Sequence, residues 1–328
     1  MSYADKVFKL MCLNILNNGV SSVGEEVRPH WEDGTEAHTL KKFCVVNRYD
    51  LSKEFPAITL RKVPIKSCTD EMLWIWQKKS NNINDLSSHV WDSWADDNGT
   101  IGKAYGYQLG KLNRYKDIIE EGLIRAFDGG EFKFSSEDIN IDWCDKTYVN
   151  GKVKAYHVTV DGVDYWYMDQ VNKVIYDLKT NPFSRRIITN LYNMSDLSEM
   201  ALYPCAYMCT FNVTKKGNRL VLNMILNQRS QDVLAANAWN VCQYAVLQHM
   251  LARECKMTVG EFVHVIADCH IYDRHMDIIK DLIKREEYNA PKLWLNPNKN
   301  SFYSFDKDDV KLIDYKYSDF NEKIPVAI

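Results

Sequence analysis

Hydrophobic residues recur at helical spacing in several parts of the chain. Between residues 4 and 18, apolar side chains at positions 7, 8, 11, 15 and 16 predict one buried helix face, and Asn17-Asn18-Gly19 ends the helix. Thr69 is the predicted N-cap of a second helix that runs through Glu71 and Trp74. Further helices are predicted over 114–127, 239–254 and 274–286.

Strand-like segments lie between these helices. Residues 153–160 and 163–168 flank Asp161-Gly162, which is a strong signal for a β-hairpin with a two-residue turn. Other strands are predicted over 43–48, 186–192, 206–213, 219–227 and 262–267. Because strands and helices are intermixed without a regular βαβ repeat, we predict an α+β fold. The absence of an internal repeat or low-complexity linker favours one domain over residues 1–328.

The composition is that of a folded protein with little overall charge. Apolar residues make up 46% of the 328 residues, and the net charge of −3 gives no general attraction to nucleic acid or to anionic membranes. Any binding site for an anion must therefore be built locally. The nine cysteines are an odd number at irregular spacing, and the first residues lack a signal-peptide pattern. We therefore expect reduced thiols, a cytoplasmic location and no transmembrane segment.

Two common kinds of ligand site lack support in the sequence. Neither GxGxxG nor GxxxxGK[ST] is present, so no phosphate-binding loop of those kinds is predicted. His264, Cys269, His270 and His275 cluster in the sequence, but their spacing fits none of the usual zinc patterns. We therefore expect no metal.

Cys205 is a candidate nucleophile. A catalytic cysteine needs a nearby positive charge that stabilises its thiolate, and Gln228-Arg229-Ser230-Gln231-Asp232 supplies one arginine after a predicted strand. Taken singly, these residues also fit ordinary structural roles. Cys205 could be a small buried apolar residue, Arg185-Arg186 a solvated strand edge, and Asn240 a helix-start residue.

The order of several motifs carries more information than any one of them. Leu202-Tyr203-Pro204-Cys205, Gln228-Arg229-Ser230, Trp239-Asn240 and His270-Ile271-Tyr272 follow one another along the chain. In this order they closely resemble the core of thymidylate synthases. Further matches to that family are Glu71-Met72-Leu73-Trp74, Trp91-Asp92-Ser93-Trp94-Ala95, Tyr105-Gly106-Tyr107-Gln108, Ser184-Arg185-Arg186 and Pro325-Val326-Ala327-Ile328. The resemblance covers nearly the whole chain except about 112–165.

The resemblance implies a fold and a reaction. The fold would be one domain with a large mixed β-sheet flanked by helices, plus a small β-hairpin insertion at about 112–165. The reaction would be reductive methylation of dUMP to dTMP by the co-substrate 5,10-methylenetetrahydrofolate, which leaves as dihydrofolate. The enzyme would be a homodimer with composite active sites.

The resemblance also implies catalytic roles. Cys205 matches the nucleophile that adds to C6 of the uracil ring, and Arg229 matches a phosphate-binding arginine beside the thiol. Glu71 matches the carboxylate of a water network that moves protons around the base. Tyr105 matches a tyrosine near the reacting carbon.

The nucleotide site implied by the family includes residues of two subunits. Arg185 and Arg186 match arginines that reach the phosphate of the partner's dUMP, for which the forked guanidinium is suited. Asn240 matches the side chain that reads uracil O4 and N3–H, because an amide both donates and accepts. The other residues expected to bind dUMP are Arg28, Gln228, Arg229, Ser230, Asp232, His270 and Tyr272.

The folate site implied by the family is mainly apolar. Trp91 and Trp94 match aromatic residues that pack on the folate and exclude water, although plain core packing also explains them. Ile328 matches a C-terminus that closes over the ligands. The full set expected at the folate is Trp91, Trp94, Asp232, Ala236, Ala327 and Ile328.

The chain departs from the family pattern at several positions. Ala206 follows the nucleophile where a histidine is usual, Ala236 replaces a glycine, and Pro64 replaces a histidine that many members use near the folate. The phosphate loop is lengthened, and either Arg28 or Arg48 could be its arginine.

Three other functions compete with this one. A dUMP hydroxymethylase would share the cysteine and the folate but would let water capture the methylene group. A cysteine hydrolase would pair Cys205 with His270, and it leaves Arg185, Arg186 and Asn240 unexplained. An RNA-binding regulator finds no support in the net charge or in any basic aromatic motif.

Overall fold

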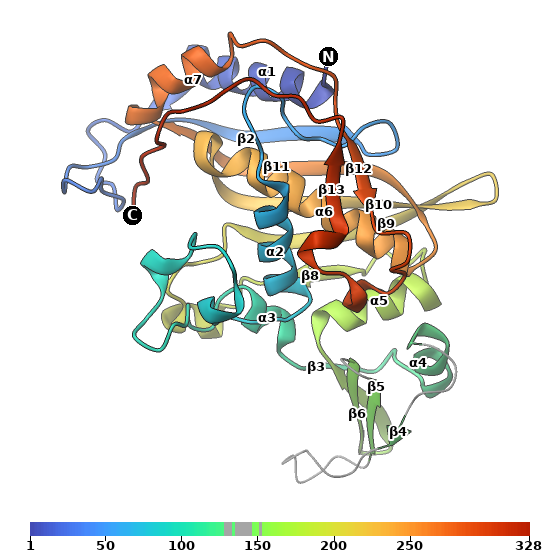
Figure 1. The fold of residues 1–328 in the computed structure, drawn as a ribbon. Helices are drawn as coiled ribbons and strands as arrows, with labels where there is room; N and C mark the ends of the chain where they lie inside the picture. The colour runs from blue at the N-terminus through green and yellow to red at the C-terminus, as the bar shows by residue number, and fades with distance from the viewer. Residues whose placement is uncertain (128–132, 135–145, 151–152) are drawn as a thin grey trace.

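A six-stranded sheet forms the centre of the molecule (Figure 1). The computed structural model describes residues 1–127, 133–134, 146–150 and 153–328. In spatial order, the strands are β1 (Val20–Ser21), β2 (Thr39–Asp50), β11 (Thr258–Tyr272), β10 (Arg219–Asp232), β9 (Ala206–Lys216) and β8 (Ile188–Asn190). β10 and β11 are parallel and the other neighbours are antiparallel, which confirms the mixed sheet expected from the sequence.

Helices cover one face of this sheet and surround its edges (Figure 1). The α-helices are α1 (Tyr3–Asn18), α2 (Ile65–Trp76), α3 (Gly106–Gly110), α4 (Glu120–Phe127), α5 (Gln170–Thr180), α6 (Ala238–Glu254) and α7 (Met276–Leu282). α6 packs on β10, β11 and α2, and it is buried along most of its length. The sequence of α6 is therefore apolar on nearly all sides rather than on one stripe.

The opposite face of the sheet remains open. Side chains alternate between the two faces of a strand, so Leu222, Met224 and Leu226 of β10 are buried under α6 while Ile225 points away. Ile225, Val46 and Ile188 are 38%, 48% and 45% exposed. The open face therefore presents apolar side chains from β2, β10 and β8, which are alternate strands of the sheet.

A second sheet lies beside α4 and α5. Its strands, all antiparallel, are β3 (Asn113–Tyr115), β7 (Val163–Met168), β6 (Val153–Val160), β5 (Lys146–Asn150) and β4 (Lys133–Phe134). The predicted hairpin is confirmed as β6–β7, with Asp161 and Gly162 at φ of 52° and 74°, as a type I′ turn requires. The insertion is thus larger than a hairpin. Residues 128–132, 135–145 and 151–152, which fall within the predicted insertion, lie outside the described residues.

Three predicted helices have other bounds in the structure. The segment 114–127 divides into β3 and α4, because residues 113–115 pair with β7 and strand pairing overrides their local helical pattern. Thr69 does not cap α2, which begins four residues earlier after Pro64; the Thr69 hydroxyl donates to the Ile65 carbonyl at 2.8 Å. The segment 274–286 is helical only to Leu282.

The remaining elements are short. A two-stranded sheet pairs β12 (Lys292–Leu295) with β13 (Val310–Ile313). The short 3₁₀ segments are Ile83–Asp85, Asp92–Trp94, Met194–Glu199, Asp273–His275, Phe302–Ser304 and Lys307–Asp309, and a π-turn spans Val233–Asn237. Within the described residues, no helix combines the length and apolarity needed to cross a membrane.

Candidate active site

Cys205 lies at the start of β9, next to the end of β10. Its backbone N–H donates to the Tyr105 hydroxyl oxygen at 3.0 Å, and its carbonyl accepts the Arg229 N–H at 2.9 Å. The thiol is partly exposed, whereas Cys209, four residues along the same strand, is buried. Two distant parts of the chain therefore hold this cysteine in place while leaving its sulfur accessible.

The Arg229 side chain fixes the segment before the cysteine. Its Nη2 donates to the Tyr203 carbonyl at 2.7 Å and its Nε donates to the Pro204 carbonyl at 3.2 Å. No carboxylate of the described residues pairs with this guanidinium. Its positive charge is thus not neutralised by an ion pair within the described residues, and it lies against the two residues that precede Cys205.

Glu71 forms the centre of a buried network between α2 and α6. Its carboxylate accepts Trp91 Nε1–H at 2.6 Å, Gln243 Nε2–H at 3.1 Å and Trp239 Nε1–H. Burial raises the pKa of Glu71, although the three donors lower it in part. A buried carboxyl whose pKa is raised holds its proton more strongly than an exposed one, which suits a general acid or base.

Gln243 connects this carboxylate to Asn240. Gln243 Oε1 accepts from Asn240 Nδ2 at 3.2 Å, while its own amide N–H donates to Glu71. Because a carboxylate only accepts, it fixes the orientation of the Gln243 amide, which then fixes that of Asn240. The sequence reasoning missed Gln243, and it named Trp239 only as part of the Trp239-Asn240 motif, without a role. The spacing of Gln243 from Asn240 on one predicted helix was the only available signal.

Gln228 approaches Asn240 from the other side. Gln228 Nε2 lies 3.5 Å from Asn240 Oδ1, and Gln228 Oε1 contacts Nε2 of the buried His264. Burial lowers the pKa of His264 to about 3, so the ring is neutral and its Nε2 carries the proton that Gln228 accepts. His264 is therefore a structural partner of Gln228.

Aromatic rings line the space between α2 and the cysteine. The Trp91 ring lies 5.0 Å from Tyr105 and 5.6 Å from Trp94, measured between centroids. Tyr105 has φ of 45°, which a residue with a side chain rarely adopts. The next residue, Gly106, packs so closely on Ser80 that a Cβ there would lie 2.1 Å from a backbone oxygen. Trp91 therefore packs against other aromatic rings, as expected, and also donates a hydrogen bond to Glu71.

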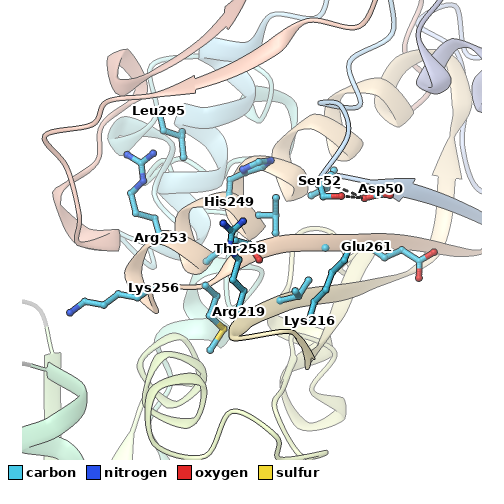
Figure 2. A pocket seen from close by; sticks show the side chains of 16 residues that line it. Asp50, Ser52, Lys216, Arg219, His249, Arg253, Lys256, Thr258, Glu261 and Leu295 are labelled. Carbon is cyan, nitrogen blue, oxygen red and sulfur yellow. Dashed lines mark hydrogen bonds between the residues drawn. The ribbon is translucent and has the colours of Figure 1, made fainter.

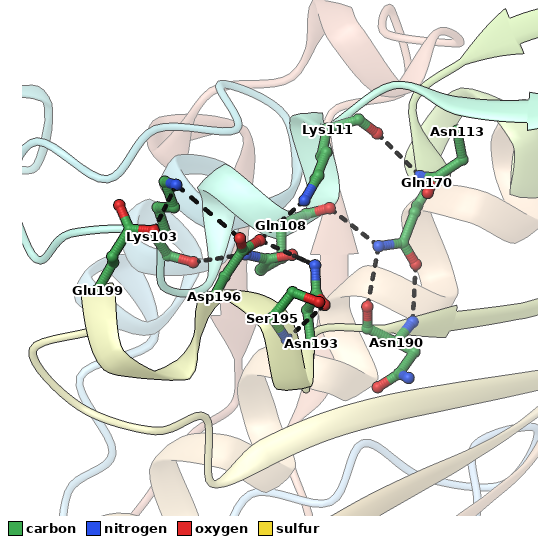
Figure 3. A network of polar contacts seen from close by, with 10 residues as sticks. All are labelled: Lys103, Gln108, Lys111, Asn113, Gln170, Asn190, Asn193, Ser195, Asp196 and Glu199. Atoms are coloured by element: carbon green, nitrogen blue, oxygen red, sulfur yellow. Dashed lines mark hydrogen bonds and ion pairs between the residues drawn. The ribbon is translucent and has the colours of Figure 1, made fainter.

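A second polar network holds the segment after Tyr105 (Figure 3). Gln108 donates to Asp196 at 2.8 Å, and Lys111 pairs with the same carboxylate at 2.9 Å. The Gln108 hydrogen bond, followed by Lys111, lowers the pKa of Asp196. Gln170 donates to the Gln108 carbonyl and to the Asn190 carbonyl, each at 2.9 Å. These hydrogen bonds connect α3, α5 and β8. Because Tyr105 directly precedes α3, they help to hold its backbone at the positive φ.

His270 and Tyr272 lie at the end of β11, beside the site. His270 Nδ1 bonds to Asp268 Oδ1 at 2.8 Å, and the Tyr272 ring meets the Trp31 ring at 5.5 Å. Burial raises the pKa of Tyr272 to about 12, so its hydroxyl remains protonated and can donate. Ser230 pairs in register with Asp268, which brings it to the same strand end.

Asp232 caps the π-turn that contains Ala236. One oxygen, Oδ1, accepts the N–H groups of Leu234 and Ala235 at 3.0 Å each and lies 3.4 Å from His275 Nδ1. His275 Nε2 in turn donates to the Pro325 carbonyl at 2.8 Å. Burial lowers the pKa of His275, but these acceptors outweigh it and the net shift is upward. His275 therefore links Asp232 to the C-terminal tail.

The C-terminal tail pairs with the loop near residue 30. The backbone groups of Ile328 and His30 exchange hydrogen bonds of 2.9 and 3.0 Å. A cavity of about 810 Å³ lies between them, lined also by Trp31, Ser93 and Arg274. Ile328 is 53% exposed and Ala327 is partly buried.

Arg28 and Arg48, the two candidates for the loop arginine, lie near opposite ends of β11. Arg28 is exposed, and its charge acts on the Tyr272 hydroxyl. Arg48 pairs with Glu261 at 2.9 Å and lies opposite Val263. Val263 and Tyr272 are nine residues apart on β11, a separation of ~30 Å. Arg28 is thus at the correct strand end, and Arg48 is not.

Arg185 and Arg186 lie far from Cys205 of their own chain. Ile188 pairs with Thr210, so Arg186 is about seven residues along the strands from Cys205, or ~20 Å. Both arginines are exposed, and neither pairs with a carboxylate of the described residues. The other site residues predicted from sequence converge on the ends of β10 and β11, whereas these two do not.

Taken over the described residues, no group of three or more His, Cys, Asp or Glu side chains is arranged to hold a metal ion. Instead, a partly exposed cysteine is hydrogen-bonded to Tyr105 and Arg229, and Tyr105 also feels the charge of the buried Glu71 carboxyl. This arrangement fits an enzyme that uses a cysteine nucleophile.

Comparisons with known proteins identify the family. The sequence model of the family described as thymidylate synthase matches residues 6–328. The chain is 41% identical to thymidylate synthase of Bacillus licheniformis and 40% identical to thymidylate synthase 1 of Bacillus subtilis strain 168, over 97% of each chain. The fold matches the solved thermostable thymidylate synthase A from Bacillus subtilis with a TM-score of 0.78, at 37% identity over 100% of both chains. The chain belongs to the thymidylate synthase family, as the motifs predicted.

Proposed function

We propose that this chain catalyses reductive methylation of dUMP by 5,10-methylenetetrahydrofolate, with Cys205 as nucleophile. The observation that carries the proposal is the placement of Cys205 between Tyr105 and Arg229, with a partly exposed thiol and a guanidinium that pairs with no carboxylate of the described residues. A deeply buried thiol such as Cys209, whose pKa burial raises, could not serve.

The chemistry requires an activated C5 on the uracil ring. When the Cys205 thiolate adds to C6, the electron pair of the C5–C6 bond moves towards C5 and O4 and forms an enolate. That enolate attacks the folate methylene; loss of the C5 proton and hydride transfer then give dTMP and dihydrofolate. Cys205 leaves C6 in the last stage, so the thiolate is regenerated.

Asn240 and Glu71 are proposed to act on the base. With Nδ2 partly engaged by Gln243, Asn240 keeps a second N–H for uracil O4 and its Oδ1 for N3–H. Glu71 would move protons through water near O4 and C5. Trp91, Trp94, Ala236, Ala327 and Ile328 are proposed folate contacts, with Asp232 near the pterin.

Phosphate and sugar binding are assigned to the ends of β10 and β11. Arg229 and Arg28 would hold the phosphate with Ser230, while His270 and Tyr272 would hold the deoxyribose hydroxyl. Gln228 would bind the nucleotide and keep Asn240 in orientation.

We further propose a homodimer in which Arg185 and Arg186 bind the phosphate in the partner's site. Their distance from Cys205 of the same chain supports this assignment, as does the apolar open face that carries Val46, Ile188 and Ile225. Residues 1–328 are proposed as one domain, since Trp166 and Met168 of the second sheet pack into the same core as α6. The eight described cysteines are free thiols, which supports a cytoplasmic location.

The direct test is an absorbance assay with dUMP and methylenetetrahydrofolate that follows dihydrofolate, combined with product analysis. We expect dTMP and dihydrofolate in equal amounts. Formation of 5-hydroxymethyl-dUMP without dihydrofolate would show hydroxymethylation instead, and turnover without folate would refute the assignment.

The shared site can be tested separately with mixed protomers. Cys205→Ser and Arg186→Ala homodimers should each be inactive or nearly so, because each site needs both residues. Refolding the two together should restore up to about one quarter of wild-type activity, since half the dimers are hybrids and each has one intact site. No recovery, with hybrids verified by mass spectrometry, would exclude the composite site.

A further inference from the structure

A cavity lies at the end of the sheet opposite the active site. It lies between the β9–β10 turn, the start of β11 and the end of α6, and its volume is about 1070 Å³ (Figure 2). Arg219 in its lining and Arg229 beside Cys205 are ten residues apart on β10, or ~33 Å. This sheet-end cavity is therefore separate from the active site, and its ligand does not depend on the proposed function.

The cations of the sheet-end cavity have no acidic partners. Lys216, Arg219, Arg253 and Lys256 line it, and none of them pairs with a carboxylate of the described residues. They come from two separate elements, the β9–β10 turn and the end of α6. Four positive charges that pair with no carboxylate of the described residues give this end of the sheet a positive potential, which favours a bound anion.

The two carboxylates of the lining do not neutralise these cations. Glu261 is held by Arg48 at 2.9 Å, and Asp50 pairs with Lys53 at 3.1 Å and accepts from Ser52. Figure 2 shows Asp50 and Glu261 on one side of the cavity, with the Glu261 carboxylate directed outward, and Arg219, Arg253 and His249 on the other. The negative and positive parts of the lining are therefore separated.

Arg253 and His249 line the cavity and keep nitrogen atoms that form no hydrogen bond within the described residues. Arg253 Nη1 donates to the Asn296 carbonyl at 2.7 Å, and its guanidinium lies 5.9 Å from the Phe305 ring, which leaves its other nitrogens for an external acceptor. The Nε2 atom of His249 is buried without a hydrogen-bond partner. Burial, helped by Arg253, lowers the pKa of His249 to about 4, so the neutral ring carries one donor and one acceptor. An unpaired buried nitrogen costs free energy that a bound polar group would recover.

We propose that the sheet-end cavity binds an anion with two or more adjacent phosphate groups, such as a nucleoside diphosphate or triphosphate. Two phosphate groups carry about three to four negative charges near pH 7, which matches the four cations. Guanidinium groups bind phosphate oxygens in pairs, and Arg219 and Arg253 supply two of them. Val221, Val259 and Leu295 add an apolar surface against which a base could pack, and the volume suits a nucleotide-sized ligand.

The test uses titration calorimetry on the full chain, with inorganic tripolyphosphate and ATP as probes at low ionic strength. Saturating dUMP is added in a parallel series, to occupy the phosphate-binding residues at the other end. We expect both probes to bind, with and without dUMP. Tighter binding of ATP would identify the nucleotide form of the ligand, and equal binding would identify the phosphate groups as the recognised part. No binding of either probe at millimolar concentration would overturn the proposal.

Charge-reversal variants test whether the two probes bind in the sheet-end cavity. Arg219→Glu with Lys256→Glu changes two exposed side chains and should weaken both probes by at least about tenfold, because each charge-assisted hydrogen bond contributes roughly that factor. Lys215→Glu with Lys284→Glu is the matched control, because it reverses the same number of charges at two exposed positions that are absent from the lining. Lys215 is adjacent to Lys216 on β9 and is directed to the other face. The control should change affinity by less than about threefold, since only long-range charge is altered. Equal weakening by both variants would show general electrostatic attraction and refute the site.

Discussion

The two ends of β10, β11 and α6 differ in how their polar side chains are satisfied. At the end near Cys205, Glu71, Gln243 and Asn240 form a continuous chain of hydrogen bonds. At the opposite end, Arg219 and Lys256 have no acidic partner among the described residues. Both ends are parts of the same rigid elements.

This difference in hydrogen bonding and ion pairing matches what catalysis and simple anion binding each require. A reaction needs donors and acceptors already oriented towards the groups on which charge develops, so internal hydrogen bonds that fix them are useful. A binding site for a highly charged anion needs net positive potential, and internal ion pairs would remove it. The paired network and the unpaired cations are therefore two solutions to two different tasks.

The largest effect is expected for Cys205→Ser. If the Cys205 end is the reactive one, turnover should fall by at least ~1000-fold, because serine is a far poorer nucleophile at neutral pH. Nucleotide binding, measured by calorimetry with dUMP, should remain. Cys209→Ser is the control on the same strand, and it should reduce stability more than turnover since Cys209 is buried. Equal losses of turnover in both variants would contradict the assignment.

Glu71→Gln should lower turnover by about 100-fold, since it removes a proton-transfer group. The pKa of Glu71 is raised in the folded state, so its stabilising contribution is full below its ordinary value of 4.5 and is lost as pH rises through the folded pKa. Glutamine does not titrate. The melting temperature of the variant relative to wild type should therefore increase between pH 4 and pH 8.

Asp70→Asn is the control for that measurement. Asp70 is also largely buried on α2, but it accepts from Ser87 N–H at 2.9 Å and takes no part in the Glu71 network. It should leave turnover within about threefold of wild type, because no proposed proton transfer uses it. A pH-independent difference in melting temperature for Glu71→Gln would mean that burial does not control this carboxyl.

The smallest effect is expected for Gln243→Leu. Without Gln243, Asn240 can rotate its amide, so the preference for dUMP over dCMP should fall by about tenfold, the value of one hydrogen bond to the base. The measurement is the ratio of kcat/KM for the two nucleotides. Gln248→Leu is the control, because Gln248 is a buried glutamine on the same helix that donates to the Leu222 carbonyl at 2.8 Å. Gln248→Leu should destabilise the fold without changing the ratio; a similar change in both ratios would remove Gln243 from its positioning role.

Local sequence predicted the elements whose pattern agrees with their packing. The helix over 4–18 and the hairpin around Asp161-Gly162 follow from apolar spacing and turn chemistry, and both are confirmed. The helix predicted over 114–127 is confirmed only for Glu120–Phe127, because residues 113–115 pair with β7, a partner about fifty residues away. Such long-range pairing leaves no signature in a short window.

The predicted site residues divide in the same way, into those that short motifs reveal and those that only the folded chain brings together. The motifs named residues for the proposed reaction, including Cys205, Arg229 and Asn240. Gln243 was missed, and Trp239 was given no role, because one turn of a buried helix offers no sign of which neighbours touch Glu71. The structure also separated Arg28 from Arg48, since strand register alone decides which arginine lies at the reactive end.

The sequence by itself thus determined the family, the candidate nucleophile and the order of the main elements, because these depend on motifs and on patterns within short segments. Only the tertiary structure decided that Cys205 is held between Tyr105 and Arg229, and that Arg186 lies too far away to serve it. It also decided that four cations line one cavity at the other end of the sheet. The physical reason is that hydrogen bonds and charges act over a few ångströms in space, and residues far apart in sequence come within that range only when the chain folds.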